Sequence, residues 1–182
     1  AGWGNDTLEG GSGNDYLVGD NGNDTYVFNL GDGNDTIYDY EYSTTGGKSD
    51  RIVFGEGIKA EDVMLERSGS HLIVHYSEND SITIHNAYYY GDGRTFVESF
   101  EFADGTVWKE QEIALGASIR RGSDEGETMN SYGGNMMGYR QDETFLAGGG
   151  ADSVYAGWGN DTLEGGRGSG RMRQARRDGF GA

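Results

Sequence analysis

The sequence predicts an all-β protein in which a parallel β-roll flanks a region of short strands. Three observations support this prediction: a nine-residue repeat near both ends, alternating apolar residues in the middle, and 34 glycines with no proline among 182 residues. Turns without proline must be built from Gly, Asn and Asp, which tolerate positive φ angles. The composition therefore favours many tight turns between short strands.

The nine-residue repeat is clearest at the start of the chain. Residues 1–9, 10–18 and 19–27 align, and a fourth copy at 30–38 follows a two-residue insertion. Each copy has a glycine two positions before an aspartate, and an apolar or aromatic residue two positions after it. These aspartates are Asp6, Asp15, Asp24 and Asp35. The repeats define a first predicted block, residues 1–40.

The same pattern returns near the end of the chain. Residues 156–166 repeat residues 1–11 letter for letter. In neighbouring copies the pattern is degenerate, because Glu143 and Gly170 stand at the aspartate position. The blocks predicted here are a second, degenerate repeat block at 119–166 and a basic tail at 167–182, which is either a decayed repeat or disordered.

The region between the repeat blocks, residues 41–118, is predicted to be mostly β. Leu72, Val74 and Tyr76 alternate with His71, Ile73 and His75. This spacing places one set of side chains on each face of a strand. The sequence predicts strands at 51–54, 62–67, 71–76, 81–85, 95–102 and 106–108, and one short helix at 109–115.

The chain is strongly acidic, with 31 Asp and Glu residues, 14 Lys and Arg residues, and a formal net charge of −17. A nucleic-acid-binding role is not expected, because phosphate binding needs a basic face. No apolar run is long enough to cross a membrane, and the absence of cysteine excludes disulfides and thiolate zinc sites. Residues 1–166 alone carry a charge of −21. The chain begins within a repeat, which predicts that it is part of a larger protein.

The repeat unit has a direct physical interpretation. Its glycine-rich part forms a turn, and the following residues form a short strand with one inward apolar side chain. Two units complete one coil of a roll, so that aspartates 18 residues apart meet between adjacent coils. Carboxylate and carbonyl oxygens are the ligands that Ca²⁺ prefers, and a bound ion removes the repulsion. Gly-Asn-Asp is also ordinary turn chemistry without metal, but four copies in register favour calcium.

The repeated Gly-Asn-Asp units resemble the RTX (repeats-in-toxin) calcium-binding nonapeptide family. The segments DRIVFGEGIKAEDV, DSITIHNAYY and FEFADGTVW are similar to a haemolysin-type calcium-binding-related domain. The resemblance implies a calcium-stabilised β-roll whose ligands are aspartates and turn carbonyls. Carried over by position, one site uses Gly2, Gly4, Asp6, Gly19, Asn21 and Asp24. A second site uses Gly11, Gly13, Asp15, Leu30, Asp32 and Asp35.

The degenerate block yields one further site by the same rule. Glu143 pairs with Asp161, again 18 residues later. Asp152 would pair with Gly170, which offers no carboxylate, so we expect that position to be empty or degraded.

The resemblance also implies a function and a location. Such modules belong to secreted or surface bacterial proteins and fold outside the cell when Ca²⁺ binds, stabilising an attached effector. The negative charge supplies a mechanism, because self-repulsion opposes the compact state until cations offset it. The alternative is a calcium-dependent adhesin or polysaccharide-binding module, since Tyr38, Tyr40 and Tyr42 alternate with acids and Tyr88–Tyr90 form a run. These rings would otherwise cover the end of a thin roll.

No catalytic constellation is evident, and we expect no enzymatic activity. Gly47-Lys48-Ser49 resembles the end of a phosphate-binding loop, but Tyr42 stands where that loop requires glycine. His75 and His85 are candidates to approach each other across strands. A solvated polar face is the favoured interpretation of these histidines over a zinc site.

Overall fold

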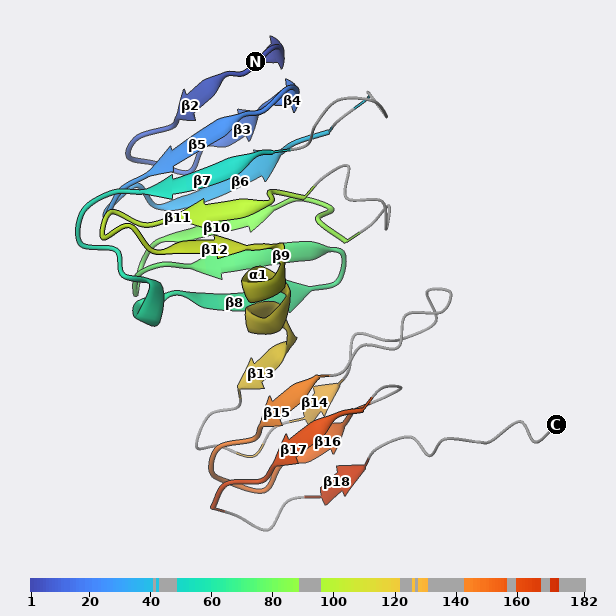
Figure 1. Cartoon of the computed structure of the whole chain (residues 1–182). Coiled ribbons are helices and arrows are strands. Elements are labelled where there is room, and N and C mark those ends of the chain that lie inside the picture. The colour runs from blue at the N-terminus through green and yellow to red at the C-terminus, as the bar shows by residue number, and fades with distance from the viewer. Residues whose placement is uncertain are drawn as a thin grey trace, which may run out of the picture. The chain divides into compact units, whose positions relative to one another are not determined.

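The computed structural model describes residues 1–40, 42, 49–88, 96–121, 126, 128–130, 143–156, 160–167 and 171–173. The chain divides into two compact units, residues 1–116 and 117–182. Among the described residues, the first unit contains two five-stranded sheets and a small two-stranded sheet, and the second contains two three-stranded sheets (Figure 1).

The first unit consists almost entirely of short strands. They are β1 (Gly2–Trp3), β2 (Thr7–Glu9), β3 (Tyr16–Val18), β4 (Asp20–Asn21), β5 (Thr25–Phe28), β6 (Asn34–Tyr38), β7 (Arg51–Phe54), β8 (Met64–Ser68), β9 (His71–His75), β10 (Ser81–Ile84), β11 (Ser99–Glu101) and β12 (Val107–Lys109). A 3₁₀-helix, η1 (Ala60–Asp62), precedes β8, and the helix α1 (Glu110–Ser118) follows β12. One sheet has the order β12-β11-β7-β5-β2 and the other the order β3-β6-β10-β9-β8.

Successive coils of the first unit stack in parallel. Thr7 on β2 pairs with Thr25 on β5, which pairs in turn with Arg51 on β7. On the other sheet, Tyr16 on β3 pairs with Thr36 on β6. The acidic residues of adjacent coils are 18 residues apart on the first sheet and 20 on the second, where the two-residue insertion falls. The predicted all-β fold with a parallel β-roll is confirmed.

The middle region continues this roll instead of forming a separate body. Strands β7, β10 and β11 extend the two sheets of the repeat strands in parallel. Antiparallel strands then end both sheets, with β12 on one side and the pair β9 and β8 on the other. The sequence divided residues 1–40 from 41–118, whereas the structure places both in one unit. The reason is that an open sheet edge offers unpaired backbone groups, which the following strands satisfy.

The core of the first unit lies between its two sheets. Every second side chain of β5, β7, β9 and β10 is buried. The burial of Leu72, Val74 and Tyr76 confirms the face predicted for this strand. Aromatic rings supply much of the volume, with Phe54 contacting Tyr76, Phe100 and Phe102 at centroid distances of 5.5, 6.1 and 5.0 Å.

The second unit is a smaller roll. Its sheets are β13 (Ile119–Arg121), β15 (Thr144–Leu146) and β17 (Thr162–Glu164) on one side, and β14 (Thr128–Asn130), β16 (Ser153–Tyr155) and β18 (Arg171–Arg173) on the other. All of these pairings are parallel. The buried core of the described residues is small: Phe145, Ala147, Val154 and Ala156, with Leu163 packed against them.

Several predicted elements are shifted at their ends. The strand at 51–54 is confirmed, whereas the strand predicted at 95–102 covers only Ser99–Glu101 of the described residues. The predicted helix at 109–115 is observed at Glu110–Ser118. Within the predicted basic tail, β18 pairs with β16 as a repeat strand would. Residues 174–182 lie outside the described part of the chain.

Within the described ranges, no helix combines the length and the apolar character needed to cross a bilayer.

Candidate metal centre

An acidic residue precedes each of the four parallel strands of one sheet. These residues are Asp6, Asp24, Asp50 and Glu98, here called the Asp24 row. The backbone N–H of each of the first three donates to the carboxylate one coil further along. Asp6 N lies 2.8 Å from Asp24 Oδ1, Asp24 N lies 2.7 Å from Asp50 Oδ1, and Asp50 N lies 2.8 Å from Glu98 Oε2. The row is therefore a continuous ladder along one edge of the roll.

The opposite edge carries a shorter row, formed by Asp15 and Asp35 and here called the Asp35 row. Asp15 N donates to Asp35 Oδ1 over 2.8 Å. The Oδ2 atoms of both residues are buried and have no hydrogen-bond partner within the described part of the chain. Burial raises the pKa of Asp35, and the charges of Asp15, Asp32 and Asp80 add to this rise, although the bond from Asp15 N–H opposes it.

Beyond the Asp35 row, Asp80 precedes β10 and stands opposite Gly33 and not opposite Asp35. Its carboxylate accepts the N–H groups of Gly31 and Gly33 at 2.9 and 3.0 Å, and the Ser77 hydroxyl at 2.6 Å. Burial raises the pKa of Asp80, but these three hydrogen bonds outweigh burial and lower it overall. Asp80 thus satisfies the turn amides with its own side chain.

The turns hold these carboxylates because glycine leaves room for them. A Cβ at Gly10 would lie 2.7 Å from Asp15 Oδ2, and one at Gly19 would lie 2.4 Å from Asp24 Oδ2. Buried carboxylate oxygens in a space walled by backbone fit a hard cation that takes oxygen ligands, as Ca²⁺ does. The residues of the Asp35 row therefore fit calcium.

The structure also brings together the turns that were predicted to supply carbonyl ligands. Gly19 O accepts Gly2 N–H at 3.0 Å, and Asn21 O accepts Gly4 N–H at 2.8 Å. In the second turn Asp32 O accepts the N–H of Gly13 at 2.8 Å. A carbonyl oxygen has two lone pairs, so it can accept an N–H group and also bind a cation.

The remaining residues of the second predicted site lie in the same turns. Gly11 and Gly13 both have positive φ angles, and the side chain of Leu30 is exposed. The insertion before Leu30 leaves Asp32 in register with Gly13, as Asn21 is with Gly4.

The second unit repeats the arrangement once among its described residues. Glu143 N donates to Asp161 Oδ1 over 3.0 Å, as predicted repeat partners should. Asp152 is buried, and its carbonyl accepts the N–H of Arg171. Its expected counterpart, Gly170, lies outside the described residues, so the expectation of an empty or degraded position stays a prediction.

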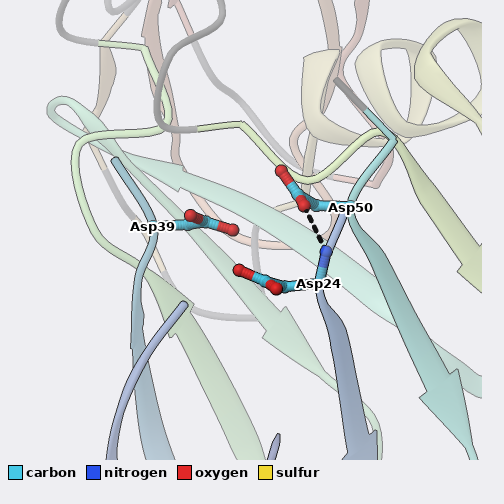
Figure 2. A group of neighbouring side chains, drawn as sticks. All are labelled: Asp24, Asp39 and Asp50. Carbon is cyan, nitrogen blue, oxygen red and sulfur yellow. Dashed lines mark hydrogen bonds between the residues drawn. The ribbon is translucent and has the colours of Figure 1, made fainter. Parts of the chain in front are cut away.

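A third buried carboxylate joins the Asp24 row. One oxygen from each of Asp24, Asp39 and Asp50 lies within 4.8 Å of the others (Figure 2). Burial, and then the charge of Asp50, raise the pKa of Asp39 to about 8, although the hydrogen bond from Tyr26 opposes this. Burial likewise raises the pKa of Glu98 to about 7. The groups around Asp39 thus make its ionised form unfavourable.

Sequence reasoning missed Asp39, Asp50 and Glu98. A signal for two of them was present, because Asp50 and Glu98, like Asp24, are followed by apolar residues two and four positions later. Asp50 follows Asp24 by 26 residues instead of 18, which hid the alignment. Asp39 carries no such signal.

The histidines are arranged differently from the prediction. Ser81 pairs with His75, and this register places His85 beside His71, with ring centroids 4.6 Å apart. The predicted approach of His75 and His85 is therefore wrong. His75 Nε2 instead lies 3.2 Å from Glu66 Oε2. Burial and the neighbouring His71 lower the pKa of His85.

Comparison with known families agrees with this geometry. Residues 1–37 and 137–172 match the RTX calcium-binding nonapeptide repeat (4 copies). The end blocks are RTX repeats. Residues 71–112 match the haemolysin-type calcium binding protein related domain. The matched RTX segments contain both members of the Asp35 row, and the related domain contains Glu98 and two of the antiparallel strands that end the roll, β9 and β12.

Two individual proteins are similar to this chain. The iron-regulated protein FrpA of Neisseria meningitidis serogroup C is 39% identical over 85 residues, which is 46% of this chain and 7% of that protein. The extracellular lipase LipA from Serratia marcescens has 16% sequence identity, covering 93% of this chain and 26% of that chain, with a TM-score of 0.41. That score is too low to establish a shared fold. The chain therefore spans a small part of each of these relatives.

Proposed function

We propose that the chain is a calcium-binding RTX module of a secreted protein, which folds when Ca²⁺ binds after export and stabilises an attached effector. The observation that carries the proposal is the Asp35 row. Two buried carboxylate oxygens, Asp15 Oδ2 and Asp35 Oδ2, have no hydrogen-bond partner among the described residues. A divalent cation is the chemistry that such oxygens suit.

The net charge supports coupling between calcium and folding. Residues 1–166 carry −21, and compacting them brings like charges together. An ion that binds only the folded state stabilises it by mass action. Free Ca²⁺ is scarce in the cytosol and abundant outside, so such a chain would fold after export.

The test is a Ca²⁺ titration followed by far-UV circular dichroism, with Mg²⁺ as the control ion and a chelator to reverse binding. We expect a cooperative gain of β signal that is specific for Ca²⁺. Asp35→Asn should weaken the response at least tenfold, because it removes a charged ligand. Asp62→Asn, an exposed aspartate on η1, should leave it unchanged. A β-rich signal that ignores both calcium and chelator would sink the proposal.

Polysaccharide binding is a second candidate, favoured by an aromatic row on the outer face of one sheet. Tyr16 stacks on Tyr38 at 6.3 Å, Tyr38 meets His85 at 5.5 Å, and His85 meets His71 at 4.6 Å. Tyr16 is 62% exposed. Flat rings in a row offer stacking surfaces to sugar rings.

Of the tyrosines that the sequence suggested for sugar binding, Tyr38 lies in this aromatic row. Tyr40 meets Tyr42 edge to face at 4.5 Å, and Tyr42 is 64% exposed. Tyr89 and Tyr90 lie outside the described residues.

A glycan-array screen in the presence and absence of Ca²⁺ separates this candidate from a pure stabiliser. Tyr16→Ala should abolish a specific signal, whereas Trp3→Ala, which removes a more exposed aromatic residue outside the row, should not. If the chain binds no glycan under either condition, stabilisation would be the only candidate function that remains. The absence of enzymatic activity remains our expectation for this module.

A further inference from the structure

Asp39 stands at the repeat position that Gly10 and Gly19 occupy in earlier units. Strands β3 and β6 pair Leu17 with Ile37 and Val18 with Tyr38, so the next residues, Gly19 and Asp39, are counterparts in adjacent coils. A Cβ at Gly19 would lie 2.2 Å from the Tyr26 hydroxyl. In the following coil the carboxylate of Asp39 accepts that same hydroxyl over 2.9 Å. The substitution therefore introduces a charged group into the inner side of a turn.

The carboxylate of Asp39 is buried, and only one of its two oxygens has a hydrogen-bond partner among the described residues. The residue is 2% exposed, and its Oδ2 atom accepts the Tyr26 hydroxyl. Its Oδ1 atom has no hydrogen-bond partner in the described part of the chain. Figure 2 shows the carboxylate of Asp39 facing that of Asp24, with Asp50 beside them. A buried, ionised oxygen without a partner is strongly unfavourable unless a cation or a proton compensates it.

Hydrogen bonds hold all three carboxylates in place. Asp24 Oδ1 accepts Asp6 N–H, Asp50 Oδ1 accepts Asp24 N–H, and Asp39 Oδ2 accepts the Tyr26 hydroxyl. Each group is thus fixed through one oxygen, and one oxygen of each lies within 4.8 Å of the others. That spacing is suitable for ligands around a single ion, because Ca²⁺ lies 2.3–2.6 Å from each oxygen.

We propose that Asp24, Asp39 and Asp50 together bind one divalent cation, in addition to the ions of the repeat sites. Asp39 adds a side-chain ligand where the repeat has none, and the hydrogen bond from Asp24 N–H to the Asp50 carboxylate along the row places Asp50 in the same site. The proposal rests on the proposed calcium function, because Asp24 also belongs to the first repeat site. Calcium is the ion expected, since all the ligands are hard oxygens.

The competing interpretation is a proton in place of the ion. Asp50, Asp24 and Glu98 all raise the pKa of Asp39, and a protonated Asp39 would relieve their repulsion without metal. The two interpretations differ in the number of ions bound, which makes them separable.

The experiment is equilibrium dialysis of the whole chain with Ca²⁺, counting the ions bound per chain. Asp39→Asn keeps an oxygen that accepts the Tyr26 hydroxyl but removes the charge, and we expect it to bind one ion fewer. Asp62→Asn should bind the same number as the unaltered chain. Circular dichroism in saturating Ca²⁺ checks that each variant folds. If Asp39→Asn does not fold, Asp39→Gly restores the residue of the repeat and should lose the same ion.

A second measurement leaves all three proposed carboxylate ligands unaltered. Terbium bound at this site would be excited through Tyr26, so Tyr26→Phe should reduce the sensitised emission markedly. An unchanged ion count in Asp39→Asn, or unchanged terbium emission in Tyr26→Phe, overturns this inference while leaving the repeat sites standing. An unaltered chain that binds no Ca²⁺ overturns both this inference and the proposed function.

Discussion

The same eleven residues lie at opposite ends of two stacks. The segment AGWGNDTLEGG occupies residues 1–11 of the first unit and 156–166 of the second. In the first unit its strand, β2, pairs with the later strand β5; in the second its strand, β17, pairs with the earlier strand β15. Consequently, the Asp6 N–H donates to the Asp24 carboxylate, whereas the Asp161 carboxylate accepts the N–H of Glu143. The repeat determines the local strand and turn. The neighbouring strands determine whether its aspartate donates a backbone N–H or accepts one.

The two units also differ in the apolar core that supports the repeats. The first has a core rich in aromatic rings and antiparallel strands that end both sheets. In the described residues of the second, four buried side chains and Leu163 form the core. A smaller core buries less apolar surface, so we expect the second unit to depend more heavily on bound calcium.

The largest expected effect comes from removing the main core side chain of the second unit. Phe145 is fully buried there, and Phe145→Ala should cost about 3–5 kcal/mol. That loss should unfold the unit in saturating Ca²⁺, so hydrogen exchange at residues 143–156 would become fast. Phe100→Ala, the matched change in the first unit, should lower stability while leaving that unit folded. Equal survival of both units would contradict the comparison.

Substituting glycines that lie close to a neighbouring backbone carbonyl should give the next largest effect. A Cβ at Gly22 would lie 1.9 Å from Gly4 O, and one at Gly166 would lie 1.6 Å from Gly148 O. Gly22→Ala and Gly166→Ala should each cost about 3 kcal/mol, because overpacking adds to backbone strain. Gly2→Ala is the control: its φ is also positive, but its Cβ meets nothing within 4 Å, so about 1 kcal/mol is expected. Thermal unfolding in Ca²⁺ measures all three, and equal losses would show that strain alone matters.

The identical segments allow a direct comparison of one side chain in two settings. Leu8 and Leu163 are both half-buried, and replacing either with Ala should cost about 2 kcal/mol. The resulting fall in Tm should be larger for the second unit, since a smaller unit has a smaller unfolding entropy. Calorimetry that resolves the two transitions tests this expectation. A larger shift in the first unit would mean that Leu8 supports more of its roll than its partial burial indicates.

The smallest expected effect is a pH dependence of the first unit in chelator. The folded state raises the pKa of Asp39 to about 8 and that of Glu98 to about 7, so it holds protons that the unfolded chain releases. The contribution of these two groups to the stability of the folded state should therefore be greatest below about pH 4. It should fall as the pH rises to 8. Acidification from about pH 8 to pH 5 should restore some β signal and raise Tm by a few degrees.

Two controls accompany this pH series. Asp39→Asn should flatten the profile, because it removes one of the two groups. Saturating Ca²⁺ should reverse the trend, because protons then compete with the ion for the same oxygens. A Tm in chelator that rises with pH would refute the assignment.

The sequence predicted the local structure well because the repeat is a local code. Glycine, Asn-Asp and one apolar residue at fixed spacing specify a turn and a strand, and Arg51–Phe54 was predicted with its observed bounds. The likeness of Glu143 to a repeat aspartate was also readable, and its amide does bond Asp161.

Long-range pairing was harder to predict. The parallel pairing of β7, β10 and β11 with repeat strands depends on which sheet edge remains open, and no local signal encodes that. The same limit explains the histidines, since the register of β9 and β10 decides that His71 faces His85. Asp39 was missed because its importance comes only from the glycine position that it occupies one coil after Gly19.

The 18-residue coil also constrains how a gene for this chain can lengthen. Duplicating a complete coil would add one rung to each row and leave every later strand on its own sheet. Duplicating a single nine-residue unit would move every later strand to the opposite sheet. Asp50 and Glu98 would then continue the edge of Asp15 and Asp35, while Asp80, which now ends that edge, would face the coil of Asp24. Because the two edges end differently, growth by even numbers of units preserves the protein, and growth by odd numbers exchanges its two sides.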